Sequence, residues 1–326
     1  MGRVHRRTVI KGLAATAATA ALGACTATRA PGAPRTPPSP SQSPSSHPPP
    51  SRSAPDQPGA GESGAGGPGT AQSGQAGPVP VGRAPTGTFA VRTQQLSLAR
   101  GKDRPLPTTI WRPAAGGPYP LILFSHGLNA VPEDYAELLT AWARAGFVVA
   151  APSYPYTAGT TADFNPIDVL NQPLDASHVI TEVARRGGVD AQRIAAGGHS
   201  AGGVTTLGMF SARRDTRLRS GVILAGRQVI AAPLTGPAAP LLFVHGKRDR
   251  TVDYADGHAV YDAVTWPKAF LTFPAGGHVA EGAELDVIAA ASTDFWRWTL
   301  YGDQAAKARI PRDATRGGLG TLANRL

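Results

Sequence analysis

A long segment near the amino terminus limits how much of this 326-residue chain can build a core. Residues 26–86 contain 15 Pro, 10 Gly and 9 Ser, and they contain no Leu, Ile, Met, Phe, Tyr or Trp. Such a composition offers too little apolar surface to offset the entropy that is lost when a chain is ordered. We therefore expect residues 25–86 to be a disordered tether. The roughly 240 residues beyond it suit one α/β domain, at 87–304, better than two conventional domains.

The residues before this segment resemble an export signal. Arg6-Arg7-Thr8-Val9-Ile10-Lys11 is similar to a twin-arginine signal, and the apolar stretch that follows, residues 12–23, is too short to be a permanent membrane helix. Leu22-Gly23-Ala24-Cys25 then resembles the lipobox of bacterial lipoproteins, whose cysteine thiol receives a diacylglyceryl group. We expect residues 1–24 to be a signal peptide and Cys25 to anchor the chain to the outer face of the cytoplasmic membrane. The alternative is a chance basic and apolar leader with an inert thiol.

Charge and cysteine content exclude several classes of function. The formal charge of the chain is +10, but residues 87–326 hold 24 Lys and Arg against 20 Asp and Glu, so this part is only mildly basic. We expect no nucleic-acid partner, because the densest cationic cluster, at 213–219, suits a solvated helix end or loop. A single Cys excludes intrachain disulfides and cysteine-based metal sites. We expect no metal, no cofactor and a monomer.

From residue 88 onward, predicted strands alternate with predicted helices. The expected strands are 88–98, 108–111, 121–124, 147–151, 194–197, 221–225, 241–244 and 269–273, and the prolines at 105, 107 and 113 should stop strand pairing. The expected helices are 133–145, 169 or 174 to 186, one from 201, one near 260, and 285–300. This alternation predicts a mostly parallel sheet, whose functional sites lie at the carboxyl ends of its strands. Residues 305–326 show little periodicity, and we expect a loosely ordered tail.

One predicted strand ends in a motif that carries chemistry. Gly198-His199-Ser200-Ala201-Gly202 stands between the strand at 194–197 and the helix from 201. This is the G-x-S-x-G pattern in the strand–turn–helix context that it requires, where small neighbours permit a strained turn that exposes the serine hydroxyl. A glycine-rich turn with an incidental serine is the alternative if no acid and base follow.

Two later strand ends supply an acid and a base. Asp249 closes the run His245-Gly246-Lys247-Arg248-Asp249, and His278 closes Gly276-Gly277-His278. A serine hydroxyl is a poor nucleophile near neutral pH, so it needs a base within hydrogen-bond reach and a carboxylate that orients this base. The candidate catalytic residues are therefore Ser200, Asp249 and His278, with Asp253 as the rival acid.

These runs and Ser125-His126-Gly127-Leu128 resemble the α/β-hydrolase family over residues 88–301. Within it, the chain is similar to compact esterases related to dienelactone hydrolases, chlorophyllases and bacterial polyester hydrolases. The resemblance implies the α/β-hydrolase fold, a mostly parallel central sheet flanked by helices. It makes Ser200 the nucleophile, Asp249 the acid and His278 the base of an acyl transfer from an ester substrate to water. It also places the oxyanion hole at the backbone amides of Leu128 and Ala201.

Two loops bear on specificity. The segment between residues 225 and 241 is too short for the large helical lid that many members of the family insert there, so we expect an open cleft. The loop at 152–166 carries Tyr154, Tyr156 and Phe164, which either form an aromatic wall for the substrate or pin down a long loop.

Other titratable residues have a structural interpretation. His126, His199 and His245 lie next to glycines at strand ends, where imidazoles commonly pack or bond locally. The spacing of Asp256, His258 and Asp262 favours a solvated helix face over a metal site.

The sequence thus predicts an exported, lipid-anchored serine esterase. An acyltransferase or peptidase that uses the same three residues is one alternative, and a non-catalytic binding lipoprotein on the same scaffold is another.

Overall fold

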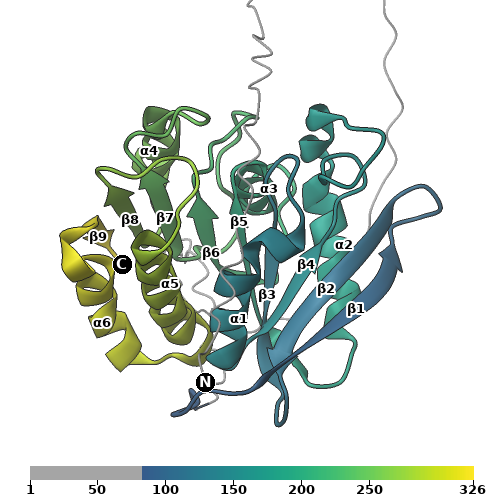
Figure 1. Cartoon of the computed structure of the whole chain (residues 1–326), viewed down its shortest axis with the longest axis horizontal. Coiled ribbons are helices and arrows are strands. Elements are labelled where there is room, and N and C mark those ends of the chain that lie inside the picture. The colour runs from purple at the N-terminus through teal and green to yellow at the C-terminus, as the bar shows by residue number, and fades with distance from the viewer. Residues whose placement is uncertain (1–82) are drawn as a thin grey trace, which may run out of the picture. The chain divides into compact units, whose positions relative to one another are not determined.

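One mixed sheet organises the part of the chain that the computed structural model describes, residues 83–326 (Figure 1). Its strands lie in the order β1-β2-β4-β3-β5-β6-β7-β8-β9. Neighbours from β4 to β8 are parallel, whereas β1, β2 and β9 are antiparallel to the strands beside them. The strands are β1 (Val91–Ala99), β2 (Pro105–Pro113), β3 (Tyr119–Ser125), β4 (Val148–Pro152), β5 (Val189–His199), β6 (Leu218–Leu224), β7 (Leu241–Gly246), β8 (Lys268–Phe273) and β9 (Thr321–Arg325).

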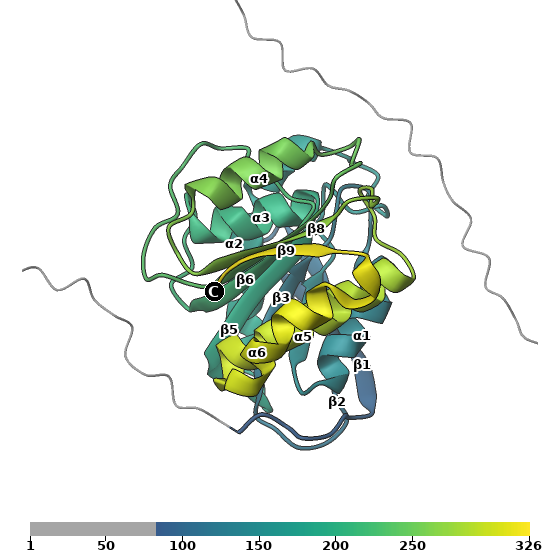
Figure 2. The ribbon, with the colours of Figure 1, turned by 90° about the vertical axis from the view of Figure 1, so that its left-hand side faces the viewer.

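Helices cover both faces of this sheet, as Figure 2 shows. One face carries α2 (Gln172–Ala184), α3 (Ala201–Phe210) and α4 (Tyr254–Ala263). The other carries α1 (Ala136–Arg144), α5 (Ala283–Tyr301) and α6 (Gln304–Ala314). Residues 83–326 also contain three short 3-10 turns, η1 (Pro132–Tyr135), η2 (Pro166–Leu170) and η3 (Arg316–Gly318). The expectation of a mostly parallel sheet flanked by helices is confirmed.

The core lies on both sides of the central strands. In β3, the side chains of Leu121 and Leu123 belong to the apolar cluster under α2 and α3, and those of Ile122 and Phe124 to the cluster under α1 and α5. All four are fully buried. A strand with helices on both faces has no solvent side, which explains why this segment reads as an unbroken apolar run.

The prediction that prolines end the pairing of the second strand is wrong. β2 pairs with β1 without interruption from Pro105 to Pro113, and β4 covers its other side, so β2 is not an edge strand. The carbonyl of Pro107 accepts from the Ser153 amide at 2.8 Å, on the β4 side. Residues two or six positions apart in a strand direct their backbone groups to the same side, so the missing N–H groups of all three prolines lie on the β4 side. The ladder to β1 therefore loses no donor.

The prediction of a loosely ordered tail is also wrong. Residues 304–314 form α6, whose Ala306, Ile310 and Ala314 are fully buried, and residues 321–325 add β9 to the edge of the sheet beside β8. The Asp303 carboxylate caps α6 by accepting from the Ala306 amide at 2.9 Å. The buried stripe is one residue wide and two of its three members are alanines, which explains why the helical pattern was weak in the sequence.

The segment between β6 and β7, residues 225–240, contains no helix or strand, as expected for a hydrolase without a large lid. Within residues 83–326, no helix combines the length and the apolar character needed to cross a membrane. The predicted signal peptide, the lipid anchor at Cys25 and the tether up to residue 82 lie outside the described residues.

Candidate active site

Ser200 occupies a tight turn between β5 and α3. Its φ of 56° and ψ of −117° place it in a region that L-residues rarely adopt, and its amide donates to the Leu224 carbonyl at 2.9 Å. The two glycines of the motif make this turn possible. A Cβ at Gly202 would overlap the carbonyl of Ser125 at the end of β3, and a Cβ at Gly198 would overlap the carbonyl of Gly202.

Asp249 and His278 meet at the same edge of the sheet, after β7 and β8. The Nδ1 atom of His278 lies 2.7 Å from Oδ2 of Asp249. The Asp249 side chain is shielded from solvent, and its Oδ1 accepts from the amides of Thr251 and Val252 at 2.8 and 2.9 Å. This carboxylate can therefore hold the His278 ring with its proton on Nδ1 and leave Nε2 free to act as a base.

A second imidazole also faces this carboxylate. Nε2 of His245 lies 3.2 Å from Oδ2 of Asp249 and 3.0 Å from the Val252 carbonyl. A carbonyl only accepts, so Nε2 of His245 carries a proton and donates toward both oxygens. Burial alone would raise the pKa of Asp249, but the hydrogen bonds from His245, His278, Val252 and Thr251 outweigh it and hold the pKa well below its usual range. Asp249 is thus a carboxylate at any pH near neutrality.

Ser200 is joined to His278 through the preceding residue. Among the hydrogen bonds of residues 83–326, none connects the Ser200 hydroxyl to His278, but Nε2 of His199 lies 2.8 Å from the His278 carbonyl oxygen. The two imidazole rings are 4.8 Å apart between centroids. Hydrogen bonds of a catalytic group are often long without substrate and shorten when it binds. The contact brings the turn of Ser200 and the loop of His278 together at one edge.

Two backbone amides near Ser200 are available to a substrate. The Gly127 amide donates to the Tyr135 hydroxyl at 3.1 Å and the Asn129 amide to the Thr157 carbonyl at 2.8 Å, whereas the Leu128 amide between them has no acceptor within residues 83–326. Ala201 is the first residue of α3, where an N–H has no partner within the helix. Gly127, the residue before Leu128, lies close to the serine, because a Cβ there would be 3.4 Å from Cβ of Ser200.

In the loop at 152–166, the structure does not support a substrate-contacting role for Tyr154. Tyr154 is fully buried and its hydroxyl lies 2.8 Å from Oγ of Ser125, so the prediction that it contacts substrate is wrong. Burial raises the pKa of Tyr154 well above its usual value. Its ring belongs to the apolar cluster under α2 and α3 and packs against His126, at 5.2 Å between centroids. The Tyr156 ring is half-buried under the Arg104 guanidinium, 5.3 Å away, and Phe164 is exposed.

The remaining candidates take no part in the contacts of Asp249 and His278. Asp253 precedes α4, and Asp256 pairs with Arg227 at 3.0 Å on the surface. His258 contacts Asp262 at 3.0 Å on the exposed face of α4. No three His, Cys, Asp or Glu side chains gather as a possible metal site in the described part of the chain.

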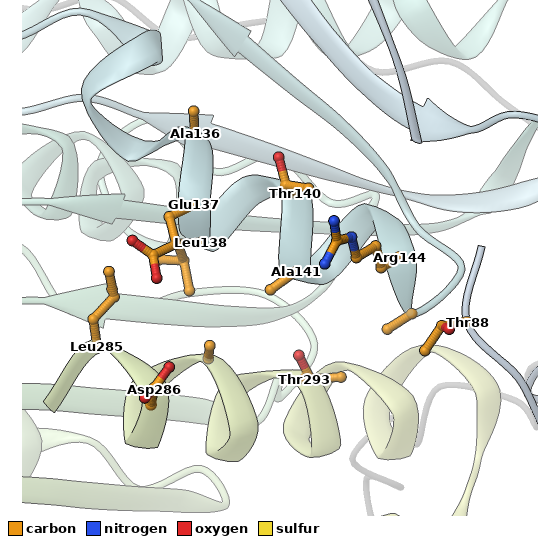
Figure 3. A pocket seen from close by; sticks show the side chains of 12 residues that line it. Thr88, Ala136, Glu137, Leu138, Thr140, Ala141, Arg144, Leu285, Asp286 and Thr293 are labelled. Carbon is orange, nitrogen blue, oxygen red and sulfur yellow. The ribbon is translucent and has the colours of Figure 1, made fainter. Parts of the chain in front are cut away.

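Two hollows lie on the helical faces. A groove of about 680 Å³ runs between α1 and α5 and is lined by small and charged side chains, among them Thr140, Arg144 and Asp286 (Figure 3). Its lining includes none of the three candidate catalytic residues, Ser200, Asp249 and His278. A smaller cavity of about 260 Å³ lies between α3, η2 and the segment after β6. Val204 is one of its lining residues, and the Val204 amide donates to the Ser200 carbonyl. Part of the cavity lining therefore lies one helical turn from the serine.

Comparisons with known proteins bear on this arrangement. Residues 81–225 match the Chlorophyllase family. The matched range contains Leu128, Ser200 and Ala201 and ends before Asp249 and His278. No curated protein matches the chain. The strand order and this match together show that the described domain has the fold that the sequence resemblance implied.

Proposed function

We propose that this chain, whose described domain has the α/β-hydrolase fold, is a serine hydrolase that cleaves carboxylic esters through an acyl-enzyme intermediate. The observation that carries the proposal is the 2.7 Å contact between Asp249 and His278 at the sheet edge that also holds the strained turn of Ser200. The Chlorophyllase match supports the same class of reaction. A serine in such a turn, with a carboxylate-bound imidazole at the same edge, is the arrangement that a nucleophile, a base and an orienting acid require, so a purely structural role explains it less well.

In the acylation step, the Ser200 oxygen attacks the carbonyl carbon of the ester while Nε2 of His278 takes the hydroxyl proton. Asp249 stabilises the resulting imidazolium through the proton on Nδ1. The negative oxygen of the tetrahedral intermediate is placed to accept from the amides of Leu128 and Ala201. The bond to the alcohol oxygen then breaks, the alcohol leaves with the proton from Nε2, and the acyl group stays on Ser200.

Deacylation repeats these steps with water. Nε2 of His278 removes a proton from the water as its oxygen attacks the acyl carbon, and the same two amides hold the second oxyanion. Collapse of this intermediate breaks the bond to Oγ, returns the proton to Ser200 and releases the carboxylic acid. A different acceptor at this stage, an amine or a sugar hydroxyl, would make the protein an acyltransferase.

The cavity beside α3 favours substrates with an apolar chain. Val204 and Gly208 of α3 line it together with three apolar wall side chains, those of Leu170, Val229 and Ile230, and with polar ones, among them Asn171, Arg213 and Gln228. Each of these three wall side chains is at least 36% exposed, which leaves apolar surface for a substrate to cover. Burial of one methylene group contributes about 0.8 kcal/mol, so each added carbon that enters this cavity strengthens binding.

A series of p-nitrophenyl esters tests the proposal on the purified full chain. We expect hydrolysis of the acetate, and a kcat/KM for the hexanoate that is about tenfold higher, because part of its four extra methylene groups is buried beside Val204. A fluorophosphonate probe should label the protein stoichiometrically.

Three results would change the assignment. A well-folded chain that neither hydrolyses these esters nor reacts with the probe supports the non-catalytic binding lipoprotein. Faster cleavage of peptide amides than of esters supports the peptidase, and transfer of the acyl group to amines or sugars in place of hydrolysis supports the acyltransferase.

We also propose that the mature protein works outside the cytoplasm while attached to a membrane by lipid on Cys25. The support is the order of sequence features in residues 1–25, namely paired arginines, a short apolar stretch and a lipobox-like cysteine. In the native host, Cys25→Ser should move the protein from the membrane to the soluble fraction and remove the lipid mass from its amino-terminal peptide. The anchor is contradicted if Cys25→Ser stays in the membrane fraction and the wild-type amino-terminal peptide carries no lipid mass.

A further inference from the structure

A tyrosine hydroxyl and a buried imidazole link three segments that surround Ser200. The Tyr135 hydroxyl, at the end of η1, lies 3.1 Å from the Gly127 amide and 2.9 Å from Nδ1 of His199. Nε2 of His199 lies 2.8 Å from the His278 carbonyl oxygen. The contacts therefore run from the loop after β3, through the turn after β5, to the loop after β8.

The direction of each hydrogen bond follows from chemistry. The His278 carbonyl only accepts, so Nε2 of His199 carries a proton. Burial and the neighbouring His278 lower the pKa of His199 to about 4, so at neutral pH its ring has one proton and Nδ1 is bare. The Tyr135 hydroxyl must then donate to Nδ1, and its oxygen accepts from the Gly127 amide. In this one direction all five polar atoms have a partner, namely the Gly127 nitrogen, the Tyr135 oxygen, both ring nitrogens of His199 and the His278 carbonyl oxygen.

We propose that Tyr135 and His199 are positioning residues that place the loop of His278 and the amide of Leu128 for the reaction at Ser200. This inference rests on the proposed function. Tyr135 fixes the tautomer of His199, and only the tautomer with a proton on Nε2 can hold the His278 main chain. By binding the Gly127 amide, the same hydroxyl fixes the peptide next to Leu128, whose N–H stays free.

Loss of the Tyr135 hydroxyl would affect both loops at once. The proton of His199 could then move to Nδ1, and a bare Nε2 would face the His278 carbonyl with two lone pairs opposed. Asp249 would still hold the His278 ring by Nδ1, but the backbone that carries this ring would be free to shift. Small displacements of a catalytic group are costly in rate, because a misplacement of about 1 Å can lower the rate about a hundredfold.

Side chains pack closely around the backbone of Gly127. A Cβ at this position would lie 3.1 Å from the Tyr135 hydroxyl and 3.3 Å from Nδ1 of His199, as well as close to Cβ of Ser200. The hydroxyl, the imidazole and the serine therefore surround one backbone position. This geometry explains how a residue that does not touch the substrate can set the position of groups that do.

The test compares Tyr135→Phe with Tyr301→Phe in the full chain. Tyr301 is the matched control, because its hydroxyl is also hydrogen-bonded to the main chain: it donates to the Gly146 carbonyl at 2.6 Å, before β4 at the opposite end of the strands. For Tyr135→Phe we expect kcat to fall about tenfold with KM changed less than about twofold, whereas Tyr301→Phe should keep kcat within about twofold. Thermal unfolding should register a loss in both variants and so does not separate them.

Substitutions at His199 supply a rescue arm. His199→Leu removes the donor to the His278 carbonyl, and we expect kcat to fall about a hundredfold. His199→Gln keeps an N–H donor and a hydrogen-bond acceptor on one side chain, so it should recover at least about tenfold of that loss. Equal activities of the two variants would contradict a role for the donor.

Nitrogen NMR of histidine-labelled protein reads the tautomer without any substrate. The His199 signals, identified by their loss in His199→Gln, should show a protonated Nε2 and a bare Nδ1 in the wild type, and a mixture of tautomers in Tyr135→Phe. A wild-type proton on Nδ1, or two tyrosine variants with the same kcat in an active enzyme, overturns this inference alone. A wild-type chain without esterase activity overturns the proposed function, and the positioning role with it.

Discussion

The Ser200→Ala variant is expected to lose about 10⁶-fold in kcat for ester hydrolysis, the size of effect seen when a serine nucleophile is removed from a triad that acts as a unit. The loss is this large because the three residues act as a unit, and without the hydroxyl no acyl-enzyme can form. Alanine keeps the backbone of the turn, so the strained φ of 56° should persist. Rates from purified protein, together with fluorophosphonate labelling, measure the effect.

Ser97→Ala is the control for this substitution. Ser97 is exposed on β1, at the edge of the sheet, so its variant should retain wild-type kcat and labelling. Both variants should unfold near the wild-type temperature. Labelling that persists in Ser200→Ala, or hydrolysis within about a hundredfold of the wild-type rate, would show that another residue is the nucleophile.

Gly202→Ala should have the largest effect on folding. The first turn of α3 lies directly against the end of β3, and the added Cβ would overlap the carbonyl group of Ser125 and approach the carbonyl oxygen of His126 to 2.8 Å. All of these atoms are backbone, so none can turn away as a flexible side chain could. We expect the free energy of unfolding to fall by about 3 kcal/mol, with loss of activity because the turn of Ser200 must move. Denaturant unfolding measures this change.

Gly187→Ala is the matched substitution. Gly187 lies in the turn after α2, and its added Cβ would have no atom within 4 Å. Its effect should stay within about 0.5 kcal/mol, as for most surface substitutions. If Gly202→Ala is equally mild, the close packing of α3 against β3 cannot be as described.

The arrangement at the sheet edge could be expected from chain order. Ser200, Asp249 and His278 each follow a strand of one parallel sheet, and the carboxyl ends of such strands share an edge. The observed pairing of β5 with β6, β6 with β7 and β7 with β8 places all three there. The strand-to-helix turn at Ser200 could be expected too, since its glycines are needed locally.

Chain order does not predict which side chains form hydrogen bonds around the candidate catalytic residues. His245 reaches Asp249, and Tyr135 reaches His199, because of the direction in which each side chain leaves its backbone. Tyr154 illustrates the reverse case, since an aromatic residue on a loop near the site is turned into the core. Sequence spacing specifies on which element a residue lies, but not which of several nearby groups its side chain contacts.

The pairing of β2 and the order of the carboxyl-terminal residues both depend on the elements that lie beside them. The prolines of β2 are compatible with a paired strand only because their missing N–H groups face away from β1. The carboxyl-terminal residues become a helix and a strand because α5 and β8 offer surfaces to cover, which a weak local pattern cannot reveal.

The sequence by itself determined the strand–helix alternation, the buried central strands and the turn at Ser200, because hydrophobic period and glycine geometry act over a few residues. It also indicated an acid and a base at later strand ends. Only the tertiary structure decided that Asp249 is shared by two imidazoles, that His199 holds the main chain of His278, and that the last twenty residues are ordered. These features arise from groups far apart along the chain, whose hydrogen bonds and burial exist only once the sheet has brought them together.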